Sequence, residues 1–359
     1  MKSKSICLNM IVKNESAVIK RSIGSIKHKI DYWVIVDTGS TDGTQEIIRE
    51  FLKDIPGELH ERPWVNIEKS RNEALALAQN KCEYILVIDA DEEWIFSKDF
   101  DKRKLFKDFY AIKSRDLNID LHRISLFKSN LPWKWRGVIH EELQCDDPTS
   151  GAVLDGIVNH GWKRDGGQNA DPNRYYKDAA ALEKALEEDP TNARYVFFLA
   201  QSYGAAKEFD LALRYYKKRA EMGGYQPEVF WSLFSIGCLQ EDLKMDEQMI
   251  IQSYCRAFEY DSTRAEPLHH LASFYHKNQQ HALSYILCKF ALTLPKPASS
   301  HYILRAIYDY SLLFLYACSA HCINQLEEAK KSYLALLGKQ DLPSEKRHIV
   351  QHNLSLLRS

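Results

Sequence analysis

The pattern of apolar residues changes once along this chain, near residues 163–170, and this change constrains the possible folds more than any other feature. Before it, short runs rich in Val and Ile alternate with helical stretches. After it, helical segments rich in Ala, Leu, Tyr and Lys follow one another without strand patterns. The 359 residues are enough for about two domains, each with its own core. We therefore predict one domain over residues 1–165 and a second over residues 171–359.

The first part has the pattern of an α/β domain. Apolar runs without polar alternation, typical of buried strands in a parallel sheet, cover residues 5–12, 33–36 and 84–88. Helical spacing covers residues 16–27, 44–52 and 70–79. Thr41 and Asp42 precede the second of these helices, where their side-chain oxygens can accept its first amide hydrogens. Alternating strands and helices predict a doubly wound, mostly parallel sheet.

The second part shows an internal repeat. Small residues that would let two helices approach closely recur at Ala200, Gly237 and Ala272. Their spacings of 37 and 35 are close to the tetratricopeptide period of about 34 residues. Ala212 and Ala282 stand at the matching site of the second helix, and a weaker copy surrounds Ala317 and Ala329. These positions predict an all-α domain of three to four degenerate tetratricopeptide-like repeats.

Composition excludes several classes of protein. The 48 basic and 49 acidic residues give a net charge of −1, which argues against a general nucleic-acid binder. The most apolar stretch, residues 312–318, is too short to cross a bilayer, and no basic-then-apolar leader opens the chain. The eight cysteines form no CxxC pair, and buried thiols explain Cys318 and Cys322, which lie one helical turn apart. We expect a cytoplasmic protein without a transmembrane segment.

An aspartate follows the second predicted strand. Asp37 is succeeded by a glycine-containing turn and then by a helix. Ligands of open α/β sheets bind at the carboxyl ends of the strands. Asp37 is therefore placed to accept hydrogen bonds from a nucleotide base or ribose. Capping of its own turn is the alternative, and the sequence leaves both open.

Four acidic residues within five positions follow the third predicted strand. Asp89 and Asp91, separated by one residue, can share a divalent ion with a diphosphate, and Mg²⁺ and Mn²⁺ favour such carboxylate oxygens. The four carboxylates would repel one another unless a cation neutralised them. For Glu92 and Glu93 a position facing water is the alternative. The pattern favours a metal site at Asp89 and Asp91.

Four ordered motifs carry a resemblance to a known family. They are Met10-Ile-Val-Lys-Asn-Glu15, Val36-Asp-Thr-Gly-Ser-Thr-Asp-Gly-Thr44, Ser70-Arg-Asn72 and Asp89-Ala-Asp-Glu92. In their order and spacing, residues 4–165 resemble the family 2 glycosyltransferases. The whole chain resembles the bacterial subgroup with a C-terminal tetratricopeptide region. This arrangement of domains is also similar to that of the peptide S-glycosyltransferases. The catalytic part also resembles lipopolysaccharide-core glucosyltransferases.

The resemblance implies a GT-A fold, a nucleotide-diphospho-sugar donor, usually a UDP-sugar, and inversion at the anomeric carbon. It implies that Val12, Asn14 and Glu15 line the nucleoside pocket and that Asp37 binds the base. Arg71 would pair with the diphosphate, for which its planar guanidinium is suited. An ion pair on the helix surface with Glu68 or Glu73 is the alternative for Arg71.

The metal ligands also follow from the resemblance. Asp89, with Ala90 beside it, would contact the ribose or the metal, and Asp91 would be the principal ligand of Mg²⁺ or Mn²⁺. A late histidine often completes the coordination in such enzymes, and His160 stands at that position. A structural role is the alternative for His160. Trp133, Trp135 and Trp162 can stack on a sugar face or pack in the core.

Inverting transfer needs a general base that deprotonates the acceptor. We predict a short strand over residues 138–139 that ends in His140, Glu141 and Glu142. Because adjacent strand residues point to opposite sides, only one glutamate can face the sugar. We choose Glu141 as the base. His140 orients it or packs against the fold.

The acceptor is less constrained than the donor site. Stacked helix pairs bind extended peptides, so a peptide or protein acceptor is our first prediction, with the repeat domain recruiting it or forming a homodimer. A saccharide or lipid-linked glycan is the second. An inactive repeat scaffold and a nucleotidyltransferase, which would release pyrophosphate, are alternatives of other classes. The choice of sugar is expected to depend on loops around residues 113–124.

Overall fold

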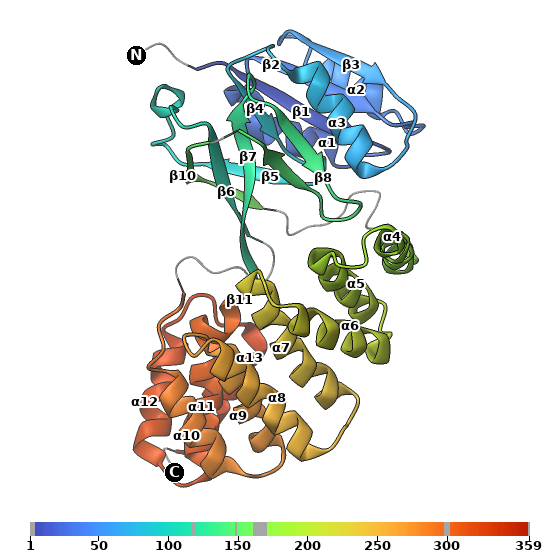
Figure 1. The fold of residues 1–359 in the computed structure, drawn as a ribbon. Helices are drawn as coiled ribbons and strands as arrows, with labels where there is room; N and C mark the ends of the chain where they lie inside the picture. Colours follow the sequence, from blue (N-terminus) through green and yellow to red (C-terminus); the bar gives the residue numbers. More distant parts are fainter. Residues whose placement is uncertain (1–3, 116–118, 148, 161–170, 298–301, 358–359) are drawn as a thin grey trace. The chain divides into compact units, whose positions relative to one another are not determined.

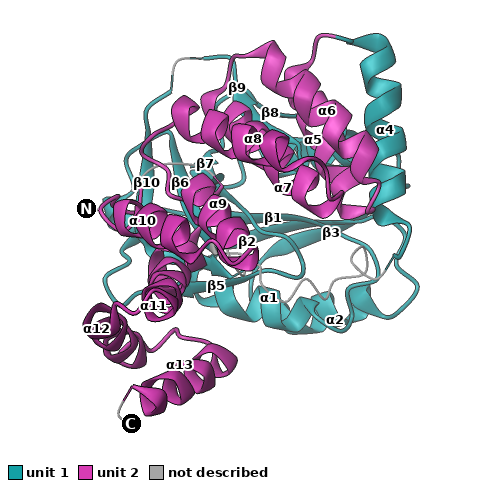
Figure 2. Ribbon diagram, turned by 90° about the horizontal axis from the view of Figure 1, so that it is seen from below, with its two compact units in different colours: residues 1–190 teal, residues 191–359 magenta. Residues whose placement is uncertain are grey.

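The computed structural model describes residues 4–115, 119–147, 149–160, 171–297 and 302–357. The chain divides into two compact units, Met1–Pro190 and Thr191–Ser359, which Figure 2 colours separately. Helix α4 (Arg174–Glu188) falls in the first unit by this division. The domain boundary at residues 165–171 that the sequence suggests places α4 with the repeats, and it stays a prediction.

A mixed sheet forms the centre of the first unit (Figure 1), in the order β3-β2-β1-β4-β7-β6-β10-β5. Its strands are β1 (Ile6–Val12), β2 (Tyr32–Asp37), β3 (Gly57–Glu61), β4 (Tyr84–Val87), β5 (Glu93–Phe96), β6 (Phe109–Arg115), β7 (Ile119–Lys128) and β10 (Gly151–His160). The β3-β2-β1-β4 half is parallel throughout. In the other half β7 is antiparallel to both neighbours, and β10 is parallel to β6 but antiparallel to β5. The predicted α/β class and all three predicted strands are confirmed.

Helices cover both faces of the parallel half. Helices α1 (Ile19–Ile26) and α2 (Thr44–Phe51) pack on one face, and α3 (Ile67–Ala78) packs on the other. Side chains of β1 alternate between two cores, so that Leu8 joins the α1–α2 side and Cys7 the α3 side. Short 3₁₀ turns, η1 (Lys27–Lys29) and η2 (Lys102–Lys104), complete the helical segments described for this unit.

The parallel register brings three strand ends to one edge. Val12, the last residue of β1, is level with Asp37, the last residue of β2. Strand β4 runs parallel on the other side of β1, with Val87 opposite Asn9. The loops that follow β1, β2 and β4 therefore leave the same edge of the sheet, which is the edge where α/β proteins bind ligands.

Antiparallel helix pairs make up the second unit. Its helices are α5 (Ala193–Ala205), α6 (Phe209–Met222), α7 (Gln226–Asp242), α8 (Glu247–Tyr260), α9 (Glu266–Lys277), α10 (His281–Ala291), α11 (Leu312–Cys322), α12 (Leu326–Leu337) and α13 (Ser344–Leu356). A short strand, β11 (Ile303–Leu304), and a π-helical turn, η4 (Ile307–Ser311), precede α11. The predicted all-α repeat domain is confirmed.

Most of the small residues that suggested the repeat lie between packed helices. Buried positions are Ala200, Ala212, Gly237, Ala272, Ala317 and Ala329. The assignment of Ala282 is wrong, because this residue is exposed. Ser284, two residues later, is fully buried and is the fourth residue of α10, as Ala212 is of α6 and Ala329 of α12.

Two further expectations are tested in this unit. Cys322 is exposed and Cys318 is only partly buried, so the explanation of the two as buried thiols is wrong for Cys322 and holds only in part for Cys318. Among the described residues, no helix combines the length and the apolar character needed to cross a membrane.

Candidate active site

Asp37 ends β2 and is 1% exposed. Its Oδ1 accepts the amide hydrogens of Gly39 and Ser40, both at 2.8 Å, so it does cap its own turn. Its Oδ2 is also buried but has no hydrogen-bond partner among the described residues. Because buried carboxylate oxygens are normally hydrogen-bonded, Oδ2 keeps the capacity to accept a further hydrogen bond.

The loop after β1 is tied to the loop after β2. The amide of Asn14 donates to the Ser40 hydroxyl and the Asn14 side-chain oxygen accepts the amide of Thr41, both at 2.8 Å. The amide of Glu15 donates to the Thr44 hydroxyl at 2.9 Å. Asn14 has a φ of 56°, which asparagine tolerates better than most residues. Asn14 and Glu15, two of the three residues predicted along the nucleoside pocket, thus lie at the carboxyl edge of the parallel strands.

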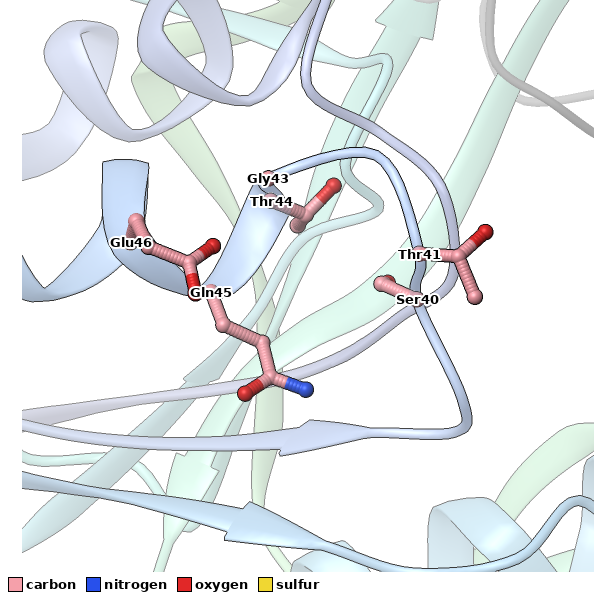
Figure 3. Close-up of a pocket in the computed structure, with 6 residues that line it drawn as sticks. All are labelled: Ser40, Thr41, Gly43, Thr44, Gln45 and Glu46. Carbon is pink, nitrogen blue, oxygen red and sulfur yellow. The ribbon is translucent and has the colours of Figure 1, made fainter.

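Asp42 fixes the start of α2. Its carboxylate accepts the amide of Ser16 at 3.0 Å and the amide of Thr44 at 3.1 Å. Burial opposes ionisation, but the hydrogen bonds from Thr44 and Ser16 lower the pKa of Asp42 to about 2. The predicted capping role is confirmed for Asp42. A polar pocket of about 200 Å³ lies at this turn. Figure 3 shows the residues that line it, Ser40, Thr41, Gly43, Thr44, Gln45 and Glu46.

Val12 and Ala90 stand at the same edge but do not turn their side chains toward it. They are 3% and 6% exposed and belong to the core beneath α1 and α2. The carbonyl of Val12 accepts the amide of Thr38 at 2.9 Å. Their contribution to a ligand site is therefore limited to shape and backbone.

Arg71, on α3, joins two carboxylates. Its Nη2 donates to Asp89 Oδ1 at 2.7 Å, and its Nε forms an ion pair with Glu141 Oε1 at 2.5 Å. The guanidinium lies 4.8 Å from the centre of the Trp135 ring, and the side chain is only 11% exposed. The predicted alternative of a pair with Glu68 or Glu73 is not what the structure has. Glu68 instead accepts the amide of Gly137 at 3.0 Å.

Arg123, on β7, is a site residue that sequence reasoning missed. It donates to Asp89 Oδ2 at 3.0 Å and to Glu92 Oε2 at 2.6 Å. Both oxygens of Asp89 are therefore paired with arginines. Burial opposes ionisation, but the charges of Arg71 and Arg123 lower the pKa of Asp89 below its usual range. No local signal marks Arg123, because 34 residues separate it from Asp89 and the antiparallel pairing of β7 with β4 brings the two together.

Glu92 is buried, so the expectation that it faces water is wrong. It is 9% exposed and accepts the Asp89 amide at 3.0 Å in addition to its bonds with Arg123. Helix α1 supports the same turn, since Ser22 donates to the Asp89 carbonyl at 3.0 Å and Arg21 to the Asp91 carbonyl at 3.1 Å. The turn after β4 is thus held from two sides.

The predicted metal ligands are not gathered around one point. His160 ends β10 and is level with Glu93 of β5. Within the described parts of the chain, the one group of three or more His, Cys, Asp or Glu side chains with ligand atoms within 4.8 Å lies in the second unit. Asp89, Asp91 and His160 do not form such a group, and their roles as metal ligands stay a prediction.

A separate hairpin supplies Glu141. Strands β8 (Trp133–Arg136) and β9 (Glu142–Cys145) pair with each other, and residues 137–141 form the bend between them. The predicted strand over residues 138–139 is wrong, because Gly137 and His140 have φ angles of 120° and 52° and turn the chain. Glu141 is 11% exposed beside Arg71, whereas Glu142 and His140 are exposed.

Two of the three tryptophans that were candidates for stacking on a sugar are core residues. Trp133 and Trp135 are 4% and 3% exposed and pack beneath α3, which supports packing over sugar stacking for both. Trp162 lies outside the described residues.

Residues 7–102 match the sequence model of glycosyl transferase family 2. The first unit contains a family 2 glycosyltransferase domain. The matched residues include the three parallel strand ends, Arg71 and the acidic turn, but they stop before Arg123 and Glu141. The resemblance predicted from the four motifs is confirmed.

Known proteins of similar sequence support a glycosyltransferase. The SPbeta prophage-derived glycosyltransferase SunS of Bacillus subtilis is 27% identical over 233 residues, which cover 60% of this chain and 53% of SunS. An uncharacterised glycosyltransferase of Rickettsia prowazekii is 37% identical over 90 residues, 25% of this chain and 29% of that protein. The chain therefore spans about half the length of SunS. It spans 29% of the length of the Rickettsia protein.

Solved structures that are similar to part of this chain include a TPR protein. The structure of YrrB, a TPR protein with an unusual peptide-binding site, is 17% identical and covers 50% of this chain and 82% of that protein, with a TM-score of 0.39.

Proposed function

We propose that this chain transfers a hexose from a nucleoside-diphosphate sugar, most simply a UDP-sugar, to a peptide or protein acceptor with inversion at the anomeric carbon. The observation that carries the proposal is the arginine cluster, which we define as Arg71 and Arg123 with Asp89, Glu92 and Glu141. This cluster surrounds the turn after β4 at the carboxyl edge of the parallel strands, where Asp37 has a buried oxygen without a partner among the described residues.

The donor site would include both Asp37, at the end of β2, and the arginine cluster around the turn after β4. Asp37 Oδ2 would accept a hydrogen bond from the base, since its Oδ1 is already used by the turn. Arginines bind phosphate oxygens through paired N–H groups. Arg71 and Arg123 are therefore the candidates for the diphosphate, with Asn14 and Glu15 bordering the nucleoside.

A divalent metal would be held chiefly by Asp91. Mg²⁺ and Mn²⁺ need oxygen ligands and commonly take one or two carboxylates together with substrate phosphates. Both oxygens of Asp89 are already bonded to arginines, which argues against Asp89 as a direct ligand. His160 stays a candidate for completing the coordination. When bound, the ion would stabilise the charge that develops on the leaving diphosphate.

Glu141 is the proposed general base. It would take the proton from the attacking atom of the acceptor as the bond to the anomeric carbon forms and the bond to the diphosphate breaks. The ion pair with Arg71 fixes its carboxylate beside the arginine cluster. Glu142 is exposed at the start of β9, which supports the choice of Glu141. His140, in the bend, would act only through Glu141.

The repeat unit supports a peptide acceptor over a glycan. On α10, Leu283, Ile286 and Phe290 are 45%, 60% and 50% exposed. Their spacing of three and four residues puts them on one face of the helix. Apolar side chains of a peptide can pack on such a face, and sugars offer far less apolar surface. A glycan acceptor and a homodimer through the repeats are the other outcomes to test.

The decisive experiment measures release of the nucleoside diphosphate. The full chain is incubated with a panel of UDP-sugars and Mn²⁺ or Mg²⁺, and UDP is compared with pyrophosphate release from UTP. We expect metal-dependent UDP release that Asp91→Asn abolishes while Asp99→Asn, at an exposed position, does not. Pyrophosphate release would support a nucleotidyltransferase. No turnover together with unchanged nucleotide affinity in Asp91→Asn would support an inactive scaffold.

The state of the thiols supports a proposal on the cellular setting. All eight cysteines are free, in agreement with the reducing, cytoplasmic location that we propose.

A further inference from the structure

Three side chains with metal-binding atoms meet in the second unit. His276 lies near the end of α9, His281 begins α10 and Cys322 ends α11. One ligand atom of each lies within 4.8 Å of the other two. None of them belongs to the glycosyltransferase domain, and the proposed transfer reaction uses none of them.

The distance between the histidines suits one shared ion. Their Nδ1 atoms are 3.2 Å apart. Two histidines on one tetrahedral Zn²⁺, each at about 2.0–2.1 Å, would have nitrogens about 3.4 Å apart. With a Zn–S distance of about 2.3 Å, the thiolate sulfur would lie about 3.6 Å from each nitrogen. The ligand atoms of the three residues already lie within 4.8 Å of one another, so a small side-chain movement would complete the site.

Gln279 orients one of the rings. Its side-chain oxygen accepts the Nε2–H of His281 at 3.2 Å. With its hydrogen on Nε2, His281 carries the lone pair on Nδ1, and this lone pair points toward His276. A second hydrogen bond of this kind, from the ring nitrogen that does not bind the metal, is the usual support of a ligating histidine.

His276 is contacted at Nδ1, the same nitrogen that faces His281. Its Nδ1 lies 2.9 Å from the Ser319 hydroxyl, which also contacts Ser284 at 2.9 Å. Burial and the neighbouring His281 lower the pKa of His276, which favours the neutral ring that a metal requires. The Ser319 hydroxyl can donate to Ser284 when the metal occupies Nδ1.

The donor atoms select the kind of metal. Two nitrogens and a thiolate favour Zn²⁺ over Mg²⁺ or Ca²⁺, which take oxygen ligands. The four residues between His276 and His281 fall within the H-x₃₋₅-H spacing of zinc sites. The two histidines are half-buried and Cys322 is exposed, so an ion can reach them from solvent.

We propose that His276, His281 and Cys322 form a zinc site that links α9, α10 and α11. Three protein ligands leave the fourth position of the tetrahedron to water or to another ligand. The ion would join helices of consecutive repeats and stabilise the second unit by binding the folded state.

The test uses the full chain with Co²⁺ and Zn²⁺ as probes. Co²⁺ bound to a thiolate gives a charge-transfer absorption band, and Zn²⁺ content is measured by equilibrium dialysis and elemental analysis. We expect Cys322→Ser to lose the band and His281→Gln to lose one equivalent of bound Zn²⁺. Cys255→Ser, which removes another exposed thiol, is the matched control and should change neither. Gln279→Met should weaken Zn²⁺ affinity about 10- to 100-fold.

Thermal unfolding gives a second readout. Zn²⁺ should raise the unfolding temperature of the wild type and of Cys255→Ser, but not that of Cys322→Ser or His281→Gln. Absence of a thiolate band in the wild type would overturn the site. So would equal Zn²⁺ binding by Cys322→Ser and Cys255→Ser, or loss of the bound Zn²⁺ in Asp91→Asn with retention in His281→Gln.

Discussion

Arg123 and Lys128 lie on the same strand and are equally exposed, at 36%, yet their partners differ. Arg123 pairs with two carboxylates, Asp89 and the buried Glu92, and Lys128 pairs with Asp108, whose side chain is 22% exposed. Arg123→Met should therefore lower the free energy of unfolding by about 1–3 kcal/mol, because it leaves carboxylates without their charged donor. Lys128→Met should change it by about 1 kcal/mol or less. Urea unfolding measures both.

Nucleotide binding gives the same pair of variants a functional readout. Arg123→Met should weaken the binding of UDP, whereas Lys128→Met should leave it unchanged. Equal effects of the two substitutions on stability and on binding would show that Arg123 is an ordinary surface residue.

Glu141 and Glu142 are adjacent, and only Glu141 contacts Arg71. If Glu141 is the general base, Glu141→Gln should lower kcat about 10²- to 10⁴-fold, the usual contribution of proton transfer. The donor KM should change little. Glu142→Gln, at the exposed neighbouring position, should retain nearly full activity in the UDP-release assay. Reversal of this order would identify Glu142 as the base.

Residues whose role depends on a strand end were predictable from the sequence. Asp37 and Asp89 directly follow apolar runs, and a parallel sheet puts such positions on one edge. Arg123 was not predictable, because its partner is fixed by strand pairing between segments far apart in the chain. The bend around His140 was also missed, since residues 138–139 are β-branched and favour a strand, while tertiary structure turns them.

At the scale of elements, replacement by alanine is expected to have opposite effects on stability at Gly237 in α7 and at Gly204 in α5. A Cβ at Gly237 would lie 2.7 Å from the Tyr254 ring, whereas one at Gly204 would lie 3.8 Å from the Cβ of Ala212. Gly237→Ala should therefore destabilise the chain by about 1–3 kcal/mol through overpacking. Gly204→Ala should stabilise it by up to about 1 kcal/mol through helix propensity. Denaturant unfolding of the two variants decides, and a stabilised Gly237→Ala would contradict the close packing of α7 on α8.

His269 on α9 makes the second unit sensitive to acid. Burial, with the nearby charges of His270, Lys346 and Lys277, lowers the pKa of His269 from 6.5 to about 3. Between these values only the unfolded chain binds the proton, so stability falls as the pH falls below 6.5. The expected slope is about 1.4 kcal/mol per pH unit.

Two variants isolate this histidine. His269→Gln should reduce the slope of the unfolding free energy between about pH 6.5 and 5 by up to about 1.4 kcal/mol per pH unit. The lowered pKa values of His270 and His276 keep the rest of the slope. His352→Gln, at an exposed position on α13, should keep the slope of the wild type. Identical slopes for all three proteins would show that His269 is not buried as a neutral ring.

Strands and helices with a strong local pattern of apolar residues could be predicted from the sequence. Those that form through pairing with other strands could not. The apolar runs of β1, β2 and β4 predicted those strands. Strand β3 (GELHE) carries one aliphatic residue and is only partly buried at the edge of the sheet, so no apolar run marks it. Strands β6 and β7 replace the loops expected around residues 113–124. The start of α3 at Ile67 rather than residue 70 follows from Asn66, whose side chain accepts the Lys69 amide.

At the scale of the whole molecule, each unit has hydrophobic cores of its own. The cores of the first unit lie on the two faces of the sheet, and those of the second unit lie between successive helix pairs. Each unit can therefore unfold as a separate cooperative transition. We expect calorimetry to show two transitions that respond to different conditions.

UDP with Mn²⁺ should raise only the transition of the first unit, because the proposed donor site lies entirely within that unit. A ligand at 100 times its Kd stabilises the folded state by about 2.7 kcal/mol. At about 2–4 °C per kcal/mol for a unit of this size, the midpoint should rise by about 5–10 °C. Lowering the pH toward 5 should lower the transition of the second unit more than that of the first, because burial lowers the pKa of His269, His270 and His276 there, whereas in the first unit it lowers that of His28. Asp91→Asn serves as the control that removes the response to UDP and metal but keeps the response to pH. A single transition that moves as a whole under both conditions would instead show that the two units unfold together.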